Sequence, residues 1–216
     1  MKIQIKNRYT GAVIFECEAD SLKLAVELAV KSRVNLSGAD LYGANLSGMD
    51  LSGADLYKAD LSGVNLSGVN LSGTNLSGVN LYGANLRGVD LSDVDFSEAN
   101  LSGANLSGAN LSNVDFSRTN LSGADFSGAN LSGVNFFGVN FSGADLYGAY
   151  LYGEKITKVP VQILWLKWRV NITEKHIQIG CKVYEAVEWF NFSDEKIMEM
   201  HPEALIFWKA IRNLLR

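Results

Sequence analysis

The chain has 216 residues, with 19 basic and 23 acidic side chains, two Cys, two His and two Pro. A net charge of −4 excludes a strongly basic protein that binds nucleic acid directly. Cys17 and Cys181 are too few and too far apart for a disulfide framework, and no stretch reaches the ~18 apolar residues of a membrane span. We therefore expect a folded cytoplasmic protein without membrane contact.

Residues 1–33 predict a small N-terminal unit of two strands and one helix. Lys2–Lys6 alternates around two Ile residues, and Val13–Cys17 reads as the returning strand of a hairpin. Asp20 or Ser21 then provides the N-cap of a helix that follows. This unit would cover the end of whatever comes next in the chain.

Residues 34–153 form 24 consecutive blocks of five residues without an insertion. We call the large apolar residue of each block position i; it is Leu at nineteen sites and Phe at five. Position i−2 is almost always Ala or Val, and position i−1 is Asn fourteen times and Asp nine times. Position i+1 is Ser at seventeen sites and position i+2 is Gly at nineteen. The repeat therefore dictates the architecture of this segment.

A period of five fits neither a helix nor a straight strand. On a helix, each block would rotate the apolar residue by 500°, which spreads Leu around the whole cylinder. On a strand, an odd period would send successive Leu residues to opposite faces. A short extended piece followed by a corner does fit, because i−2 and i then face inward while i−1 faces outward and Ser-Gly turns the chain.

Such blocks must close on themselves to bury their inward residues. We expect four sides per coil, since opposed Leu rows then lie near the ~10 Å packing distance of facing sheets. The 20-residue spacing of Phe96, Phe116 and Phe136 agrees with one stacked column, which Phe126 and Phe141 do not join. The 24 blocks would make about six coils, a solenoid roughly 29 Å tall at ~4.8 Å per coil.

Two blocks illustrate a family resemblance: Ala54-Asp55-Leu56 and Ala44-Asn45-Leu46-Ser47-Gly48. They resemble the A(D/N)LXX signature of the pentapeptide repeat family. The resemblance implies an all-β-dominated fold, a right-handed quadrilateral β-helix, with small α+β caps at both ends. It implies little about activity: most members lack a known function, and some resemble a DNA duplex in shape and charge and inhibit DNA gyrase.

Residues 154–216 predict a separate C-terminal α+β unit that contains all four Trp residues. Alternating patterns around residues 168–172 and 177–181 read as a hairpin, and Ser193 is a good helix start. In the last segment an apolar helical face carries Trp208, Ile211 and Leu215. The unit is either a simple cap or a cap through which two copies associate, and that face is the candidate association surface.

No group of residues predicts catalysis. His176 and His201 are the only histidines and neither lies in a triad or metal motif. Cys181, on an alternating apolar face, is better explained as core than as half of a metal site with His176. Glu185 and Glu188, one helical turn apart, are expected on a solvated face. We expect no enzyme activity, no cofactor and no metal.

Acidic side chains are concentrated in the repeats. Residues 34–153 hold ten Asp and one Glu against Lys58, Arg87 and Arg118, a net charge of −8, whereas each flanking segment is +2. DNA carries one charge per ~1.7 Å, so the solenoid would have about half that charge density. It could compete for a basic groove, although not strongly by charge alone.

The alternative is that Asp merely replaces Asn at i−1, where either side chain bonds locally or stacks between coils. Four blocks per coil would place Asp40 beside Asp60, Asp95 beside Asp115, and Asp125 beside Asp145, and such like-charge stacking is mildly destabilising. That cost favours a selected surface charge. The densest group is the acidic patch, which comprises Asp90, Asp93, Asp95 and Glu98.

Two functions remain open. The first is a structural or protein-interaction module that contacts an unidentified protein partner through the acidic patch, with the C-terminal unit as a candidate homodimer interface. The second is a DNA-mimicking inhibitor of a DNA-binding enzyme such as gyrase. Gyrase-directed members of the family typically carry loops that project from the shaft, whereas these 24 blocks are unbroken, so we expect weak or no inhibition.

Overall fold

The computed structural model describes residues 1–136, 139–151, 154–156, 161–163, 170–172, 176–179 and 182–200. The chain divides into two compact units, Met1–Pro160 and Val161–Arg216, and each is described by itself.

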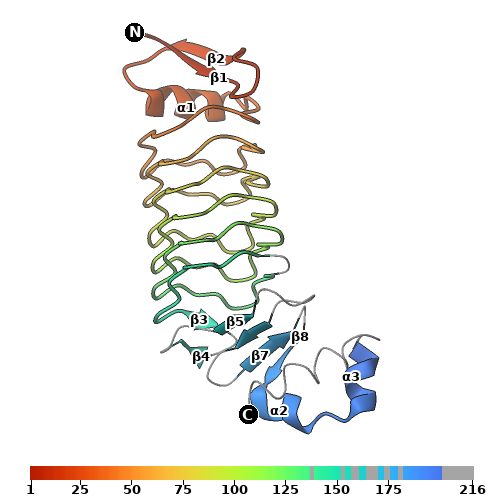
Figure 1. Ribbon diagram of the computed structural model, residues 1–216. Helices are drawn as coiled ribbons and strands as arrows, with labels where there is room; N and C mark the ends of the chain where they lie inside the picture. The colour runs from red at the N-terminus through yellow and green to blue at the C-terminus, as the bar shows by residue number, and fades with distance from the viewer. Residues whose placement is uncertain are drawn as a thin grey trace. The chain divides into compact units, whose positions relative to one another are not determined.

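The first unit begins with an antiparallel hairpin of β1 (Lys2–Lys6) and β2 (Val13–Glu18), followed by α1 (Leu22–Lys31). Of the two N-cap residues considered, Ser21 is the one used: its side chain accepts a hydrogen bond from the Leu24 N–H. Figure 1 shows α1 lying across the first coil of the repeats, with the hairpin beyond it. Ile5, Val26 and Ala29 are fully buried in the same apolar cluster as the repeats.

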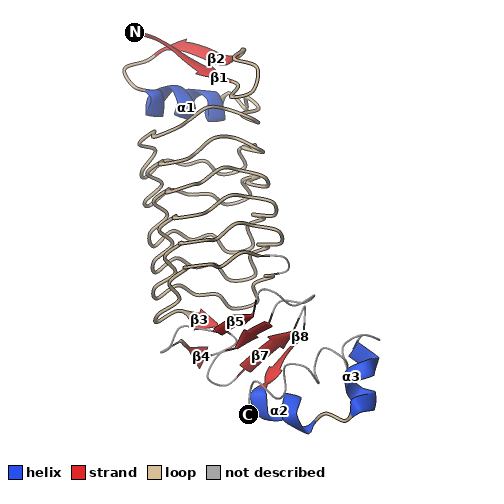
Figure 2. Ribbon diagram, in the orientation of Figure 1, coloured by secondary structure: helices blue, strands red, loops and turns tan. Residues whose placement is uncertain are grey.

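The repeats wind into a stack of coils with a 20-residue period, which corresponds to four blocks per coil. Parallel bridges join position i−1 of one coil to position i−1 of the next, for example Asn80 to Asn100. The N–H of residue i also donates to a carbonyl nineteen residues later, as Leu66 does to Asn85 at 2.9 Å. All 24 residues at position i are at most 7% exposed, so the predicted inward orientation is confirmed. Because each wall is paired at one residue only, the coils appear as plain loops in Figure 2.

We number the four walls by the outward i−1 residues that they carry, in chain order. Wall 1 carries Asn35, Asp55, Asn75, Asp95, Asp115 and Asn135. Wall 2 carries Asp40, Asp60, Asn80, Asn100, Asn120 and Asn140. Wall 3 carries Asn45, Asn65, Asn85, Asn105, Asp125 and Asp145. Wall 4 carries Asp50, Asn70, Asp90, Asn110, Asn130 and Tyr150.

The interior changes from Leu to Phe along the stack. Phe96, Phe116 and Phe136 form the predicted column behind wall 1, with ring centroids 5.6 and 6.0 Å apart and nearly parallel planes. Phe126 on the opposite wall 3 and Phe141 on the neighbouring wall 2 pack edge-on against this column, as their different register requires. The C-terminal coils therefore have an aromatic core, whereas the earlier coils have an aliphatic one.

Every described repeat corner turns through a residue with positive φ at position i+2. Glycine takes this conformation without cost, and at seventeen of these corners a glycine has φ between 63° and 76°. At five repeat corners another residue does so, namely Lys58, Asp93, Glu98, Asn113 and Arg118, with φ of 53–61°. Each non-glycine corner, Asn least, carries a backbone cost that glycine avoids.

The C-terminal end of the first unit folds back on the last coil. β3 (Tyr150–Leu151) pairs with β4 (Glu154–Lys155), and the buried Ile156 donates its N–H to the Ala149 carbonyl. This segment supplies hydrogen-bond partners for backbone groups of the last coil that would otherwise have none.

The second unit contains a four-stranded antiparallel sheet in the order β5 (Val161–Ile163), β6 (Val170–Ile172), β7 (His176–Ile179) and β8 (Lys182–Glu185). The predicted hairpin corresponds to β6 and β7. Two helices follow, α2 (Ala186–Asn191) and α3 (Asp194–Met200), and Ser193 accepts the Lys196 N–H at the start of α3 as predicted. Trp189 is 2% exposed and contacts Phe192 edge-on at 5.7 Å.

The corner geometry generates a stability prediction. A Cβ at Gly103 would meet nothing within 4 Å, whereas a Cβ at Gly78 would lie 2.9 Å from Cγ of Lys58. Gly103→Ala should therefore cost only the positive-φ penalty, about 1 kcal/mol of unfolding free energy. Gly78→Ala should cost measurably more, and adding Lys58→Gly should recover the excess. Chemical denaturation measures all three; equal losses for the two single variants would contradict this assignment.

Candidate functional site

The outward Asn and Asp side chains share one role and differ in another. In both, Oδ1 accepts the backbone N–H two residues later; the Ser52 N–H, for example, reaches Asp50 at 3.0 Å. This bond stabilises the start of each corner. Only Asn can also donate Nδ2 to the i−1 side chain of the preceding coil, as Asn110 does to Asp90 at 3.0 Å. An Asp therefore accepts from the following coil but offers no donor to the preceding one.

The structure confirms the three predicted Asp-on-Asp stacks. Parallel bridges pair Asp40 with Asp60, Asp95 with Asp115, and Asp125 with Asp145. The first stack is compensated, because Arg8 of the N-terminal unit forms a 3.2 Å ion pair with Asp60 and donates to the Ala59 carbonyl. The other two stacks lie on walls 1 and 3, and within residues 1–136 no Lys or Arg forms an ion pair with Asp95, Asp115 or Asp125.

The four residues of the acidic patch lie along half of one coil. Asp90 is exposed on wall 4 and Asp95 is exposed on wall 1. Asp93 occupies the corner between these walls, with φ 59°, and accepts a hydrogen bond from Asn113 of the next coil at 3.1 Å. The patch thus faces two directions and is centred on a corner.

Glu98 differs from the other three members of the acidic patch. It occupies the corner between walls 1 and 2 and forms a 3.3 Å ion pair with Arg118 of the next coil. The 20-residue register could have revealed this pairing from sequence, because residues 98 and 118 occupy the same corner. The same register adds Asp115 beneath Asp95, so the uncompensated acids are Asp90, Asp93, Asp95 and Asp115.

All five non-glycine repeat corners border wall 1. Asp93 and Asn113 lie between walls 4 and 1, and Lys58, Glu98 and Arg118 lie between walls 1 and 2. Lys58 packs along its corner over Gly78 and stacks on the Tyr57 ring at 4.8 Å. Wall 1 is therefore flanked by charged side chains of both signs, each held in a conformation that glycine would adopt more readily.

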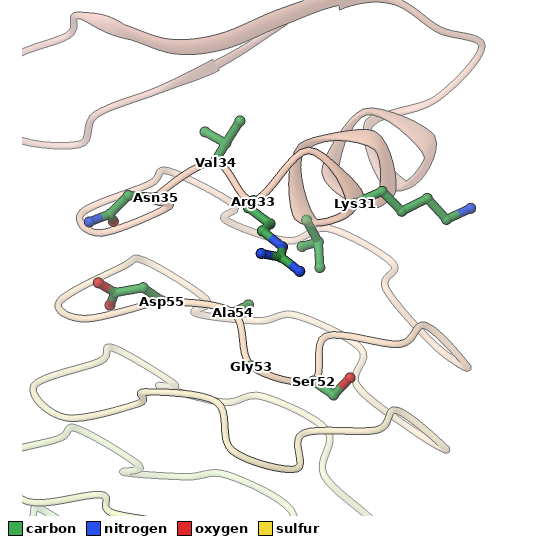
Figure 3. Close-up of a pocket in the computed structure, with 9 residues that line it drawn as sticks. Lys31, Arg33, Val34, Asn35, Ser52, Gly53, Ala54 and Asp55 are labelled. Carbon is green, nitrogen blue, oxygen red and sulfur yellow. The ribbon is translucent and has the colours of Figure 1, made fainter.

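A pocket of about 420 Å³ lies where α1 meets the first coil. Figure 3 shows Arg33 extending into it above Ala54, with Asn35 and Asp55 further along the same opening. Arg33 ends the helix with φ 56°, and its N–H donates to the Val30 carbonyl rather than to the coil below. The pocket is thus a consequence of the junction between helix and solenoid.

Several candidates from sequence lie elsewhere or outside the described residues. Trp208, Ile211, Leu215, Cys181 and His201 are outside them. His176 on β7 pairs in register with Glu185 on β8. Glu185 and Glu188 are exposed, as expected, but the expectation that they share one helical face is wrong. Glu185 ends β8 and caps α2, and Glu188 accepts the Glu185 N–H at 2.8 Å in a capping box.

In the described part of the chain, no cluster of three or more His, Cys, Asp or Glu side chains has a metal-binding arrangement. No helix among those residues is long and apolar enough to cross a membrane.

The family model "Pentapeptide repeats" matches residues 32–68, 65–103, 99–138 and 115–153, which together span more than half of the chain. The match supports the β-helix that the five-residue pattern predicts. Comparison with curated protein sequences gives no match.

Similar solved structures include two cyanobacterial pentapeptide repeat proteins and one fluoroquinolone resistance protein. Rfr23 from the cyanobacterium Cyanothece 51142 is 31% identical over 49% of this chain and 82% of its own, with a TM-score of 0.39. HetL from Nostoc sp. strain PCC 7120, involved in heterocyst differentiation regulation, is 32% identical over 57% and 66%, with a TM-score of 0.37. QnrB1, a plasmid-mediated fluoroquinolone resistance protein, is 25% identical over 52% and 75%, with a TM-score of 0.24. Since all three TM-scores are below 0.5, the family assignment is drawn from the repeat match.

The hydrogen bonds of the Asx side chains generate a pH prediction. Hydrogen bonds from Ser52 lower the pKa of Asp50, and those from Ser92 lower the pKa of Asp90. Burial works to raise the pKa of Asp60, but bonds from Ser62, the Arg8 charge and Asn80 outweigh it and lower that pKa as well. A lowered pKa means that the ionised form stabilises the fold.

The stability from these carboxylates should be complete above their ordinary pKa of 3.8 and be lost as pH falls below it. Thermal unfolding between about pH 6 and pH 2.5 measures the effect. Asp50→Asn with Asp90→Asn should flatten the acid limb of the curve, since Asn keeps the Oδ1 acceptor. An acid limb as steep as that of the wild type would show that these two carboxylates do not contribute.

Proposed function

Because this chain belongs to the pentapeptide repeat family, we propose that it is a non-enzymatic interaction module that binds a protein partner through the acidic surface of its solenoid. The observation that carries the proposal is the arrangement of charge around wall 1. Asp93, Asp95 and Asp115 stand there without an ion-pair partner within residues 1–136, in a segment whose net charge is −8. A partner with a cluster of Lys and Arg complements this surface.

The rigid repeat supports such a role. Asp95 and Asp115 are each fixed by a hydrogen bond from their own corner and are joined by an inter-coil bridge, so their charges are held at a set spacing. Preorganised charges lose little conformational entropy when a partner binds. The stacked Asp95 and Asp115 repel each other mildly in the free protein, and a cationic side chain placed between them would relieve that repulsion.

The acidic patch predicted from sequence is kept, with Asp115 added and Glu98 given a lesser role. The Glu98 charge is already compensated by Arg118 in an exposed ion pair. It therefore attracts a cationic partner less strongly than Asp90, Asp93 and Asp95 do. The apolar face with Trp208, Ile211 and Leu215 stays the proposed homodimer surface. Light scattering of the full chain tests it, since a dimer has twice the 23.5 kDa of one copy.

The chain offers a matched pair of variants for testing the acidic surface. Asp95→Asn with Asp115→Asn removes two stacked charges from wall 1, and Asp125→Asn with Asp145→Asn removes two stacked charges from wall 3. Asn occupies most i−1 positions, so neither variant should unfold the solenoid. In affinity capture from extract of the native host, partners should be retained about tenfold less by the wall 1 variant. Equal capture by both variants would exclude wall 1 as the contact.

A second function, inhibition of a DNA-handling enzyme by DNA mimicry, is favoured by one observation, the charge of −8 on the repeats. The mixed signs at the corners beside wall 1 weaken the likeness to a phosphate backbone. We therefore expect little or no inhibition of gyrase supercoiling at micromolar protein. Potent inhibition below that concentration would place the second function ahead of the first.

A further inference from the structure

Apart from one missing bond at the first coil, from the Asp55 N–H to Val34, the inter-coil hydrogen bonds are interrupted along one run of positions. Between residues 36 and 136, each coil donates regularly to its neighbours, and six consecutive bonds of this pattern are missing between residues 68–76 and 87–95. The N–H groups of Gly68, Leu71, Gly73 and Leu76 do not reach the coil that follows, and those of Asp90 and Asp95 do not reach the coil that precedes. We call this pair of segments the seam.

The seam occupies one side of the solenoid. The missing bonds run from the corner between walls 3 and 4, across wall 4 and on to wall 1. On the opposite side the same two coils are joined normally, with Gly63 N–H to Tyr82 carbonyl at 2.8 Å and Leu66 N–H to Asn85 carbonyl at 2.9 Å. Gly78 N–H resumes the pattern, reaching Ser97 at 2.9 Å. The two coils are therefore joined by backbone hydrogen bonds along one edge and lack them along the other.

Solvent exposure locates the seam independently. Between residues 56 and 130 the inward i−2 side chains are almost all at most 2% exposed. The exceptions are Val69, Thr74 and Val94, each 6% exposed, and all three border the seam. These three side chains remain buried but are slightly more exposed than the other i−2 residues of this range.

The sequence offers two reasons for the missing bonds, one in the packing of the interior and one in the outward side chains. Inside, Val69 lies above Val89 and Thr74 above Val94, and behind wall 1 the column changes from Leu76 to the larger Phe96. Branched or larger side chains thus meet on two adjacent walls at a single level, which crowds the interior. Another level also stacks such pairs on two adjacent walls, Val114 with Val134 and Thr119 with Val139, and its backbone bonds are intact, so crowding alone does not break the bonds.

Outside, the Asn ladder cannot close across the seam. Asn70 and Asn75 donate Nδ2 to Asp50 and Asp55 of the preceding coil. The residues below them, Asp90 and Asp95, have no side-chain donor with which to continue the ladder. Both adjacent walls therefore lack the side-chain bond at a level where the interior is also crowded, whereas at the other such level Asn135 and Asn140 supply it.

We propose that the seam is a hinge, at which the coils up to residue 86 bend relative to the coils that follow. Because the intact bonds lie diagonally opposite, the pivot is the corner between walls 2 and 3, near Ser62 and Tyr82. Opening moves the corner between walls 4 and 1 most, where Gly73 faces Asp93. The inference stands on hydrogen bonding and exposure and does not rest on the proposed function.

Amide hydrogen exchange by NMR tests the open seam. Leu66, Leu71, Leu76 and Leu101 share the local sequence Asn-Leu-Ser, so their intrinsic exchange rates match. Leu71 and Leu76 should exchange at least about 100-fold faster than Leu66 and Leu101, whose N–H groups are bonded. Rates within about threefold of one another would overturn the hinge.

A matched pair of variants tests the cause. Asp90→Asn with Asp95→Asn supplies Nδ2 donors to Asn70 and Asn75, and should slow exchange at Leu71 and Leu76 about tenfold. Asp125→Asn, where the backbone ladder is intact, should leave both rates unchanged. Equal effects of the two variants would remove Asp90 and Asp95 from the explanation.

Bending is measured by spin labels in a chain with Cys17→Ser and Cys181→Ser. Labels at residues 52 and 132 span the seam along its open corner, and labels at 42 and 122 span the same level along the pivot. The first pair should give the broader distance distribution, narrowed by Asp90→Asn with Asp95→Asn. Equal widths for the two pairs would show a stiff rod and overturn the proposal.

Discussion

The structure depends on a single local constraint, a positive φ every five residues. At that angle the chain turns a corner in two residues, and the carbonyl of residue i accepts the N–H of residue i+3. Four such corners return the chain to its starting direction after twenty residues. The inward Leu and Phe residues, the outward Asx residues and the inter-coil hydrogen bonds all follow from that return.

Within this frame, the choice between Asn and Asp determines both charge and cohesion. Each gives the corner the same Oδ1 acceptor, so the two residues are interchangeable for the coil itself. They differ between coils, because Asn extends a ladder in both directions and Asp in one only. Every Asp on a wall therefore adds surface charge and removes one donor toward the preceding coil. The acidic surface and the seam have this chemistry in common, since Asp90 and Asp95 contribute to both.

The sequence predicted the coil and its interior well, because these depend on position within a strict period. The inward residues, the Phe column and the three Asp stacks all appear as expected. The ion pairs that alter the acidic patch were missed for different reasons. The ion pair between Glu98 and Arg118 could have been predicted from the 20-residue register, because the two residues lie twenty positions apart. The ion pair between Arg8 and Asp60 could not, because it depends on how the N-terminal hairpin packs on the first coils. Glu185 was misassigned because a strand runs directly into its helix, leaving no turn to mark the boundary.

The seam is a feature that the repeat pattern alone does not predict. Each feature that produces it is ordinary within the repeat: Val at i−2, Phe at i, Asp at i−1. Val94 and Val114 stack on wall 1 with their backbone bonds intact, so one crowded wall is tolerated. Separation occurs where crowding on two adjacent walls coincides with the loss of both side-chain donors. Bending there would change the spacing between Asp55 and Asp95 on wall 1, which lie on either side of the seam. If the proposed hinge bends, the acidic surface would follow a curved partner while the opposite corner keeps the coils in register.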